Sequence, residues 1–167
     1  MSKSYRILVC DDREEITNTF SELLSPEKDI GINELKGLAS SLFETEDSNL
    51  QERPRIKLRV DTANQGLEAI DMAVDAQKAS DPYKVAVLDM RMPPGINGFE
   101  TAIRLIEIDP KIELCFCTAY SDIKISVLTH TLGEGRFLLL KKPVNPDELI
   151  TTVEFLSNNS VKCSEKA

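Results

Sequence analysis

The stretch Lys84-Val-Ala-Val-Leu-Asp-Met-Arg-Met-Pro-Pro-Gly-Ile-Asn-Gly-Phe-Glu100 decides how the rest of the chain is interpreted. It begins with a short apolar run, Val85 to Leu88, which is typical of a strand buried in a sheet. The run ends on the carboxylate of Asp89, and a turn rich in Pro and Gly leads into a helical pattern near Gly98. Taken alone, Asp89 is equally well explained as a strand-ending residue that caps the following turn. The remainder of the chain decides between that structural role and a functional one.

The composition indicates a globular chain with one sizeable core. Its 167 residues suit one domain, with 41% hydrophobic and 29% charged residues. The formal net charge of −8 argues against direct nucleic-acid binding, because phosphate contacts need clustered cations. The sequence has no apolar run of membrane-spanning length and no signal-peptide pattern. We therefore expect a cytoplasmic protein that binds neither nucleic acid nor a membrane directly.

The cysteines fit a reducing compartment. Cys10, Cys115 and Cys117 lie in or beside predicted buried strands, where free thiols are the simplest interpretation. A zinc site is not expected, because Cys115 and Cys117 lack the CxxC spacing and His130 is the only histidine.

Five apolar segments alternate with helical patterns along the chain. Such alternation predicts an α/β fold, a parallel sheet with right-handed crossovers and with helices on both faces. The segment 55–62 alternates apolar and charged residues, which suits an edge strand with one wet face. The expected strands are 5–10, 55–62, 85–89, 112–117 and 137–140, and the expected helices are 14–24, 64–78, 98–108, 123–132 and 147–156.

One segment, about residues 26–54, interrupts this order between the first helix and the second strand. Apolar residues at helical spacing predict an extra amphipathic helix near Asn33–Phe43, followed by an exposed acidic loop. This insertion is either a partner-binding element or an elaborated loop at the amino ends of the strands. We expect one domain over residues 5–156 and a polar, frayed tail over residues 157–167.

Polar residues follow four of the predicted strands. These are Asp11 and Asp12, Asp89, Thr118 and Lys142. Because the carboxyl ends of parallel strands share one edge of a sheet, we expect these side chains to converge on one crevice. Three carboxylates repel one another unless a cation lies among them, and carboxylate oxygens with waters suit Mg²⁺. A lysine and a hydroxyl opposite the ion suit the oxygens of a phosphoryl group. The pattern therefore predicts an aspartate that accepts a phosphoryl group with the help of Mg²⁺.

Each of these residues also has a structural explanation. Asp11 or Asp12 would cap the first helix, and Thr118 would make a local hydrogen bond. Lys142, which precedes Pro143, would be a solvated turn residue. Their joint occurrence at four strand ends favours the functional interpretation.

The strand-end motifs resemble those of the receiver domain of two-component response regulators. The matching pieces cover residues 5 to 156 except the insertion, and they are Ile7-Leu-Val-Cys-Asp-Asp12, Val87-Leu-Asp-Met-Arg-Met-Pro93, Cys117-Thr-Ala-Tyr120 and Leu140-Lys-Lys-Pro143. The resemblance implies a flavodoxin-like, doubly wound, five-stranded sheet in the order 2-1-3-4-5. The loop and threonine motifs are also similar to receivers at the N-terminus of larger sensory proteins, so we expect a single-domain regulator or an excised receiver.

The resemblance implies a role for each acidic residue of the site. Asp89 would accept the phosphoryl group from a histidine kinase, a phosphotransfer protein or a small phosphodonor. Asp12 would bind Mg²⁺ directly, and Asp11 would bind it mainly through water. The backbone carbonyl of Arg91 would be a further ligand of the ion.

The resemblance also assigns the two remaining residues. Thr118 and Lys142 would each contact a phosphoryl oxygen, and the Lys142–Pro143 peptide bond would be cis. Phosphorylation would shift a surface made by the helix near 123–132, the last strand and the last helix. A downstream output domain or protein would bind that surface, and self-association into a homodimer stays open.

Two details depart from the family pattern. The loop from Met92 to Gly98 is one residue longer than is common, so its geometry is expected to differ. An aromatic residue that moves with the threonine often lies three positions before the lysine, where this chain has Leu139. Phe137 on the same strand face and Tyr120 near Thr118 are the nearby aromatic residues.

The leading interpretation is a phosphorelay switch whose only enzymatic activity would be self-dephosphorylation. Two other functions compete with it. The first is a Mg²⁺-dependent phosphohydrolase with an aspartate nucleophile, but such enzymes usually carry a DxD motif after the first strand, and this chain has Asp11-Asp12-Arg13. The second is an interaction module that works without phosphorylation, against which the intact set of site residues argues.

Overall fold

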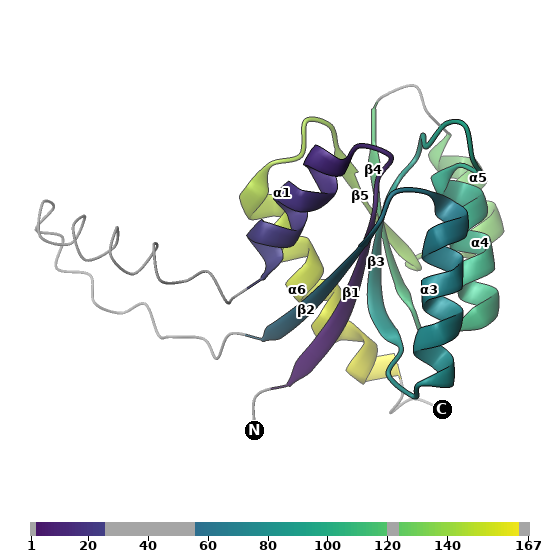
Figure 1. The fold of residues 1–167 in the computed structure, drawn as a ribbon. Helices are drawn as coiled ribbons and strands as arrows, with labels where there is room; N and C mark the ends of the chain where they lie inside the picture. Colours follow the sequence, from purple (N-terminus) through teal and green to yellow (C-terminus); the bar gives the residue numbers. More distant parts are fainter. Residues whose placement is uncertain (1–2, 26–55, 120–123, 164–167) are drawn as a thin grey trace, which may run out of the picture.

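The computed structural model describes residues 3–25, 56–119 and 124–163, with side chains described up to Asn158. Five parallel strands form one sheet in the order β2-β1-β3-β4-β5, which confirms the predicted doubly wound topology (Figure 1). The strands are β1 Ser4–Cys10, β2 Lys57–Ala63, β3 Tyr83–Asp89, β4 Glu113–Thr118 and β5 Phe137–Lys141.

Helices cover both faces of the sheet, as the alternating pattern predicts (Figure 1). On one face lie α1, Glu14–Leu24, and α6, Pro146–Cys163. On the other face lie α3, Gly66–Lys78, α4, Gly98–Ile108, and α5, Ile125–Leu132. The insertion at 26–54, with the extra helix predicted in it, lies outside the described residues.

The core consists of two layers, one on each side of the sheet. Ile7 and Val9 of β1 point into the layer under α1 and α6, whereas Leu8 and Cys10 point into the layer under α3, α4 and α5. Strands that are buried on both faces consist of continuous apolar runs, which is why Val85 to Leu88 show no polar alternation. Each fully buried aliphatic side chain contributes roughly 1.5–3 kcal/mol relative to an exposed one.

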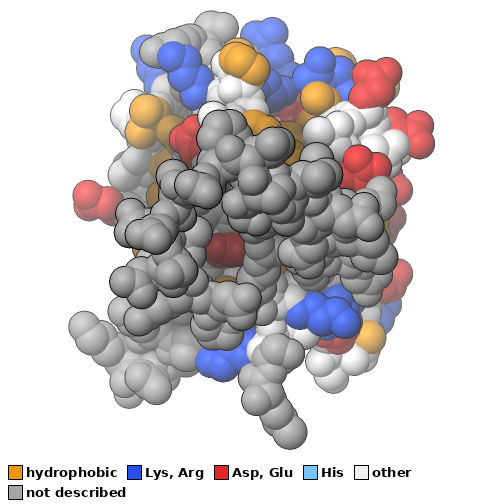
Figure 2. All heavy atoms as spheres, turned by 90° about the vertical axis from the view of Figure 1, so that its left-hand side faces the viewer, with side chains coloured by type: hydrophobic (Ala, Val, Ile, Leu, Met, Phe, Trp, Pro, Cys, Tyr) orange, Lys and Arg blue, Asp and Glu red, His pale blue; other side chains and the backbone are white. Residues whose placement is uncertain are grey.

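Strand β2 lies at one edge of the sheet, as its alternating sequence predicts. Leu58 is buried, whereas Lys57 and Arg59 are exposed. The guanidinium of Arg59 pairs with Asp81 at 2.8 Å. Acidic and basic side chains are interspersed around the visible rim of this side of the molecule (Figure 2). The wet face of β2 is thus stabilised by charge pairs rather than by apolar packing.

The predicted end of the last helix is wrong. Helix α6 continues from Pro146 to Cys163 instead of ending near Leu156. Ser157, which we assigned to a frayed tail, is buried, and its Oγ donates to the carbonyl oxygen of Val153 at 2.7 Å. The polar residues beyond Leu156 contain no Gly or Pro, so nothing in the backbone stops the helix there.

The three described cysteines are free and buried, which confirms their predicted state. Burial raises the pKa of the Cys10 thiol and of the Cys117 thiol to about 12, so both stay protonated at neutral pH. In the part of the chain that the structure describes, no helix has the length and apolar character needed to cross a membrane.

The amino end of α4 approaches the end of β3 so closely that only glycine fits at position 98. A Cβ atom on Gly98 would lie 2.2 Å from the carbonyl oxygen of Asp89. The Gly98 N–H donates to the carbonyl of Met90 at 3.2 Å. One residue earlier, the Asn97 side chain accepts the N–H of Glu100 at 2.8 Å in a capping box. Helix α4 therefore starts at a fixed position beside Asp89.

Replacing Gly98 with Ala should destabilise the fold, because the added methyl group meets the Asp89 backbone, which cannot move aside independently. We expect the free energy of unfolding, measured by urea denaturation, to fall by about 1–3 kcal/mol. Glu107→Ala, on the exposed side of the same helix, is the control and should change it by less than about 0.5 kcal/mol. Equal stability of Gly98→Ala and the wild type would contradict the close approach.

Candidate functional site

Three carboxylates meet at the end of the sheet where β1 and β3 finish. Asp11 and Asp12 follow β1, and Asp89 is the last residue of β3. One carboxylate oxygen from each residue lies within 4.8 Å of the other two. The structure thus brings together the three acids that the sequence analysis predicted to converge, at the switch point of the doubly wound sheet.

Asp11 is the more deeply held of the two acids that follow β1. Only 2% of the residue is exposed, and its Oδ1 accepts the N–H of Arg13 at 2.9 Å. Its own N–H donates to the carbonyl of Ala63 at 3.2 Å, which ties the end of β1 to the end of β2. Burial, with a further contribution from the charge of Asp89, raises the pKa of Asp11. Ionisation of the Asp11 carboxylate therefore lowers the stability of the folded protein.

Helix capping does not explain the two acids. The N-cap residue of α1 is Arg13, which makes no side-chain capping bond, so neither Asp11 nor Asp12 occupies the cap position. Asp12 is half-buried next to its more deeply buried neighbour. Two consecutive acids at a strand end, without a capping role, are better explained by a shared cation.

Lys142 lies directly against Asp89. Its Nζ donates to Asp89 Oδ1 at 2.6 Å, and Asp89 is only 4% exposed. A charge-assisted bond of this length is a strong one, because the buried partner is shielded from water. The Lys142–Pro143 peptide bond is cis, as predicted. The ammonium thus pairs with Asp89, and the carboxylates of Asp11 and Asp12 each have an oxygen within 4.8 Å of an Asp89 oxygen.

Thr118 ends β4 and is partly exposed at the same edge. Its Oγ1 donates to the carbonyl oxygen of Ala119 at 2.8 Å. Its own carbonyl accepts the N–H of Lys142 at 3.0 Å, which joins the ends of β4 and β5. The two predicted phosphoryl-contacting residues are therefore linked through the backbone.

The loop after Asp89 carries Arg91 back toward the site. The N–H of Arg91 points to Asp89 Oδ1 at 3.4 Å. Next along the loop, Met92 is buried, and the Cys10 thiol donates to its sulfur at 3.3 Å. The Pro93–Pro94 peptide bond is cis, in addition to the cis bond that the sequence predicted. We did not predict that the Met92 side chain would be buried. The available signal was an apolar residue within a turn rich in Pro and Gly.

The aromatic residue of β5 does not lie beside Thr118. Phe137 pairs with Leu114 at the opposite end of the strand pair, and its ring packs edge-on against Phe116 with centroids 5.9 Å apart. Leu139 is the half-buried residue nearer the site on that strand face. Tyr120 lies outside the described residues.

The residue types at this edge fit a divalent cation. All three acids offer oxygen, which is the ligand that Mg²⁺ prefers. These three acids would hold such an ion, directly or through waters. Lys142 pairs with Asp89, and Arg13 Nε lies 3.8 Å from Asp11 Oδ1, so two cations face three carboxylates and a net negative charge remains. Such a site suits the attachment of an anionic group once a cation is present.

The sequence matches the response regulator receiver domain over residues 48–154. The chain belongs to this family, the receiver domains of two-component systems. Receiver domains are in general signalling modules rather than enzymes. The matched range begins after β1 and so does not include Asp11 and Asp12. The fold places these two residues beside Asp89, which lies within the matched range.

Two proteins with related sequences are regulatory proteins. The chain is 33% identical over 144 residues to the transcriptional regulatory protein CpxR homolog of Haemophilus influenzae, covering 86% of this chain and 53% of that protein. It is 30% identical over 94 residues to the oxygen regulatory protein NreC of Staphylococcus carnosus, covering 56% of this chain and 40% of that protein. The chain thus spans about half the length of the first relative and less of the second.

Solved structures agree on the fold. A CheY-like response regulator receiver domain protein from Methanospirillum hungatei superposes with a TM-score of 0.63 at 19% identity, covering 97% of this chain and 98% of that one. At this identity the likeness concerns the fold alone, and it confirms the flavodoxin-like arrangement.

Replacing Asp11 with Asn should raise the melting temperature of the metal-free protein. The raised pKa of Asp11 means that ionisation costs stability: the cost is absent below its usual value of 3.8 and grows as the pH rises through the higher folded-state pKa. Asn keeps the acceptor for Arg13 without the charge. We expect a gain of a few degrees near pH 8, given about 2–4 °C per kcal/mol at this size.

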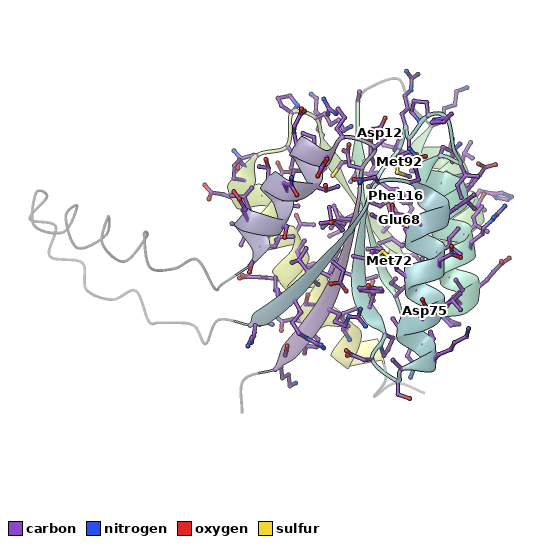
Figure 3. The ribbon with its side chains drawn as sticks, in the orientation of Figure 1. Asp12, Glu68, Met72, Asp75, Met92 and Phe116 are labelled. Carbon is purple, nitrogen blue, oxygen red and sulfur yellow. The ribbon has the colours of Figure 1, made fainter. Side chains whose placement is uncertain are left out.

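The control for this measurement is Asp75→Asn, on the exposed side of α3 and away from the cluster (Figure 3). In thermal unfolding followed by circular dichroism with EDTA, the gain for Asp11→Asn should shrink as the pH falls toward 3.8. A melting temperature of Asp11→Asn no higher than that of Asp75→Asn at pH 8 would show that the ionised Asp11 carboxylate does not destabilise the fold.

Proposed function

We propose that this receiver domain is a phosphorelay switch in which Asp89 accepts a phosphoryl group with the assistance of Mg²⁺. One observation carries the proposal: the Asp89 carboxylate lies within 4.8 Å of two other carboxylates and 2.6 Å from the Lys142 ammonium. The acids offer a place for a cation and the ammonium offers a place for a second anionic oxygen. A carboxylate next to two such positions suits nucleophilic attack on phosphorus.

The proposed step needs no proton transfer at Asp89. One carboxylate oxygen attacks the phosphorus of the donor and forms a mixed anhydride, while the bond from phosphorus to the donor nitrogen or oxygen breaks. The leaving group takes the electron pair of that bond. When bound, the divalent ion supplies positive charge that offsets the carboxylates and the phosphoryl oxygens. Asp12, Asp11 and the backbone carbonyl of Arg91 are the groups that we propose hold it.

Lys142 and Thr118 are the proposed phosphoryl contacts. The ammonium already lies within hydrogen-bond distance of Asp89 and would move to a phosphoryl oxygen once Asp89 carries the phosphoryl group. The Thr118 hydroxyl, now bonded to the Ala119 carbonyl, would turn to donate to another such oxygen. Because the Thr118 carbonyl is bonded to the Lys142 N–H, both movements act on the ends of β4 and β5.

We propose a partner-binding surface on the elements around these strands. Exposed hydrophobic side chains occur on the three elements that the sequence analysis proposed for this role, namely Ile125 and Val127 of α5, Leu138 of β5 and Phe155 of α6. We propose that phosphorylation changes this surface and with it the affinity for an output domain or protein. The receiver family suggests a histidine kinase or phosphotransfer protein as donor.

Incubating the protein with acetyl phosphate and Mg²⁺ should add one phosphoryl group, seen in the intact mass. Asp89→Asn should abolish the addition, because an amide oxygen is a far weaker nucleophile than a carboxylate. Asp71→Asn, with the same charge change on the exposed side of α3, is the control and should be phosphorylated normally. EDTA should suppress the reaction in both proteins that carry Asp89.

Persistence of the added mass in Asp89→Asn would contradict the assignment of the acceptor. Release of many equivalents of phosphate from varied phosphate esters would instead support an aspartate-dependent phosphohydrolase. In the phosphorylated wild type, amide hydrogen exchange should change in peptides from α5, β5 and α6 more than in those from β2. Equal changes, or none, would refute the proposed surface.

A further inference from the structure

One side-chain contact joins the two loops beside the site and involves a residue outside the family motifs. Gln65 lies in the turn between β2 and α3, and its Nε2 donates to the carbonyl oxygen of Pro93 at 3.4 Å. We propose that Gln65 is a positioning residue, which holds the loop after Asp89 so that the Arg91 backbone faces the acidic cluster. Gln65 would thereby set the affinity for Mg²⁺, an inference that rests on the function proposed above.

The local needs of the turn do not explain the direction of the Gln65 side chain. Gln65 is the N-cap of α3, yet its side chain makes no capping hydrogen bond. The Glu68 carboxylate instead accepts the N–H of Asn64 at 2.8 Å and so satisfies a backbone group of the turn. Glutamine is not among the favoured N-cap residues. The side chain is therefore oriented by the neighbouring loop rather than by its own helix.

The turn that carries Gln65 is packed tightly against α4. A Cβ atom on Gly66 would lie 2.2 Å from Oγ1 of Thr101 and 2.7 Å from Cγ1 of Ile96, so α3 begins in direct contact with α4. The Thr101 hydroxyl in turn donates to the carbonyl of Asn97 at 2.8 Å. Because both helices are fixed here, a loop that binds Gln65 is held against the body of the domain.

The far part of the loop is shaped to receive Gln65. A Cβ atom on Gly95 would lie 2.5 Å from Oε1 of Gln65, so a side chain at position 95 would push the end of the Gln65 side chain away from its present place. That Oε1 is buried and has no hydrogen-bond partner among the described residues. An unpaired buried acceptor costs about 1–3 kcal/mol, so this side-chain position adds little to the stability of the turn by itself.

The near part of the loop is fixed to the core. Met92 is 1% exposed, and the Cys10 thiol donates to its sulfur at 3.3 Å. The Gly95 N–H donates to the Met92 carbonyl at 3.1 Å and closes the turn between the two anchors. Met92 lies at the same end of the sheet as Asp12 (Figure 3). Arg91 immediately precedes Met92, so its backbone position depends on both contacts of the loop, Met92 with the core and Pro93 with Gln65.

The first test is calorimetric titration of the full chain with Mg²⁺. Gln65→Ala should weaken binding by about tenfold, as residues that orient metal ligands commonly do. Gln65→Asn should weaken it similarly, because its shorter side chain cannot reach Pro93. Gln77→Ala, which removes a glutamine from the far end of α3, should bind like the wild type. A merely structural role for Gln65 would lower the free energy of unfolding in urea and leave the dissociation constant unchanged.

A double-mutant cycle with Gly95 tests the contact itself. Gly95→Ala should weaken Mg²⁺ binding, because the new methyl group meets Gln65 Oε1. In the Gln65→Ala background the same change should have almost no effect, since the remaining neighbour, the Met92 carbonyl oxygen at 3.7 Å, is at ordinary contact distance. Additive effects, or wild-type affinity in Gln65→Ala, would overturn the assignment of Gln65.

The outcomes separate this inference from the proposed function. If the wild type binds Mg²⁺ and is phosphorylated while Gln65→Ala is unchanged in affinity, only the role of Gln65 is refuted. If the wild type neither binds Mg²⁺ nor accepts a phosphoryl group, both are refuted. Faster amide exchange of residues 90–97 in metal-free Gln65→Ala than in Gln77→Ala is expected when Gln65 holds the loop.

Discussion

The site depends on one buried ion pair, Asp89 with Lys142, placed next to two further carboxylates. Two like charges about 4 Å apart repel by roughly 4 kcal/mol at an effective dielectric constant near 20. The Lys142 ammonium offsets one negative charge, and the more exposed Arg13 guanidinium, 3.8 Å from Asp11, offsets a second in part, so the cluster keeps a net negative charge. The fold tolerates this because the parallel sheet fixes the ends of β1, β3 and β5 at one edge, and the packing of two core layers supplies the stability. That net negative charge attracts a cation, and the cation together with Lys142 would favour an anionic phosphoryl group at Asp89.

Much of this arrangement could be predicted from the sequence, because it rests on strand periodicity and on residues at strand ends. The continuous apolar run before Asp89 identified a strand buried on both faces, and the alternating segment at 55–62 identified the edge strand. Once five such strands alternate with helices, the parallel sheet brings Asp11, Asp12 and Asp89 together, with Lys142 at the neighbouring strand end. The order of the strands came from the family resemblance.

The remaining features depend on tertiary contacts that leave a weak trace in the sequence. Helix α6 passes Leu156 because Ser157 is buried and bonds back to Val153, whereas its polar character suggested a tail. Phe137 packs on Phe116, away from the site, because it pairs with the far end of β4. The longer loop after Asp89 was recognised as a departure. Its contacts, Met92 with Cys10 and Pro93 with Gln65, are made with residues distant in the chain.

The most direct test of the account is the binding of Mg²⁺ to the wild type, Asp12→Asn and Asp75→Asn, measured by calorimetry at neutral pH. If the excess of carboxylates at the strand ends is a cation site, the wild type and Asp75→Asn should bind one ion per chain with equal affinity. Asp12→Asn should lose that binding, although it keeps the shape of the side chain. Equal binding by Asp12→Asn and the wild type, or no binding by the wild type, would contradict the account.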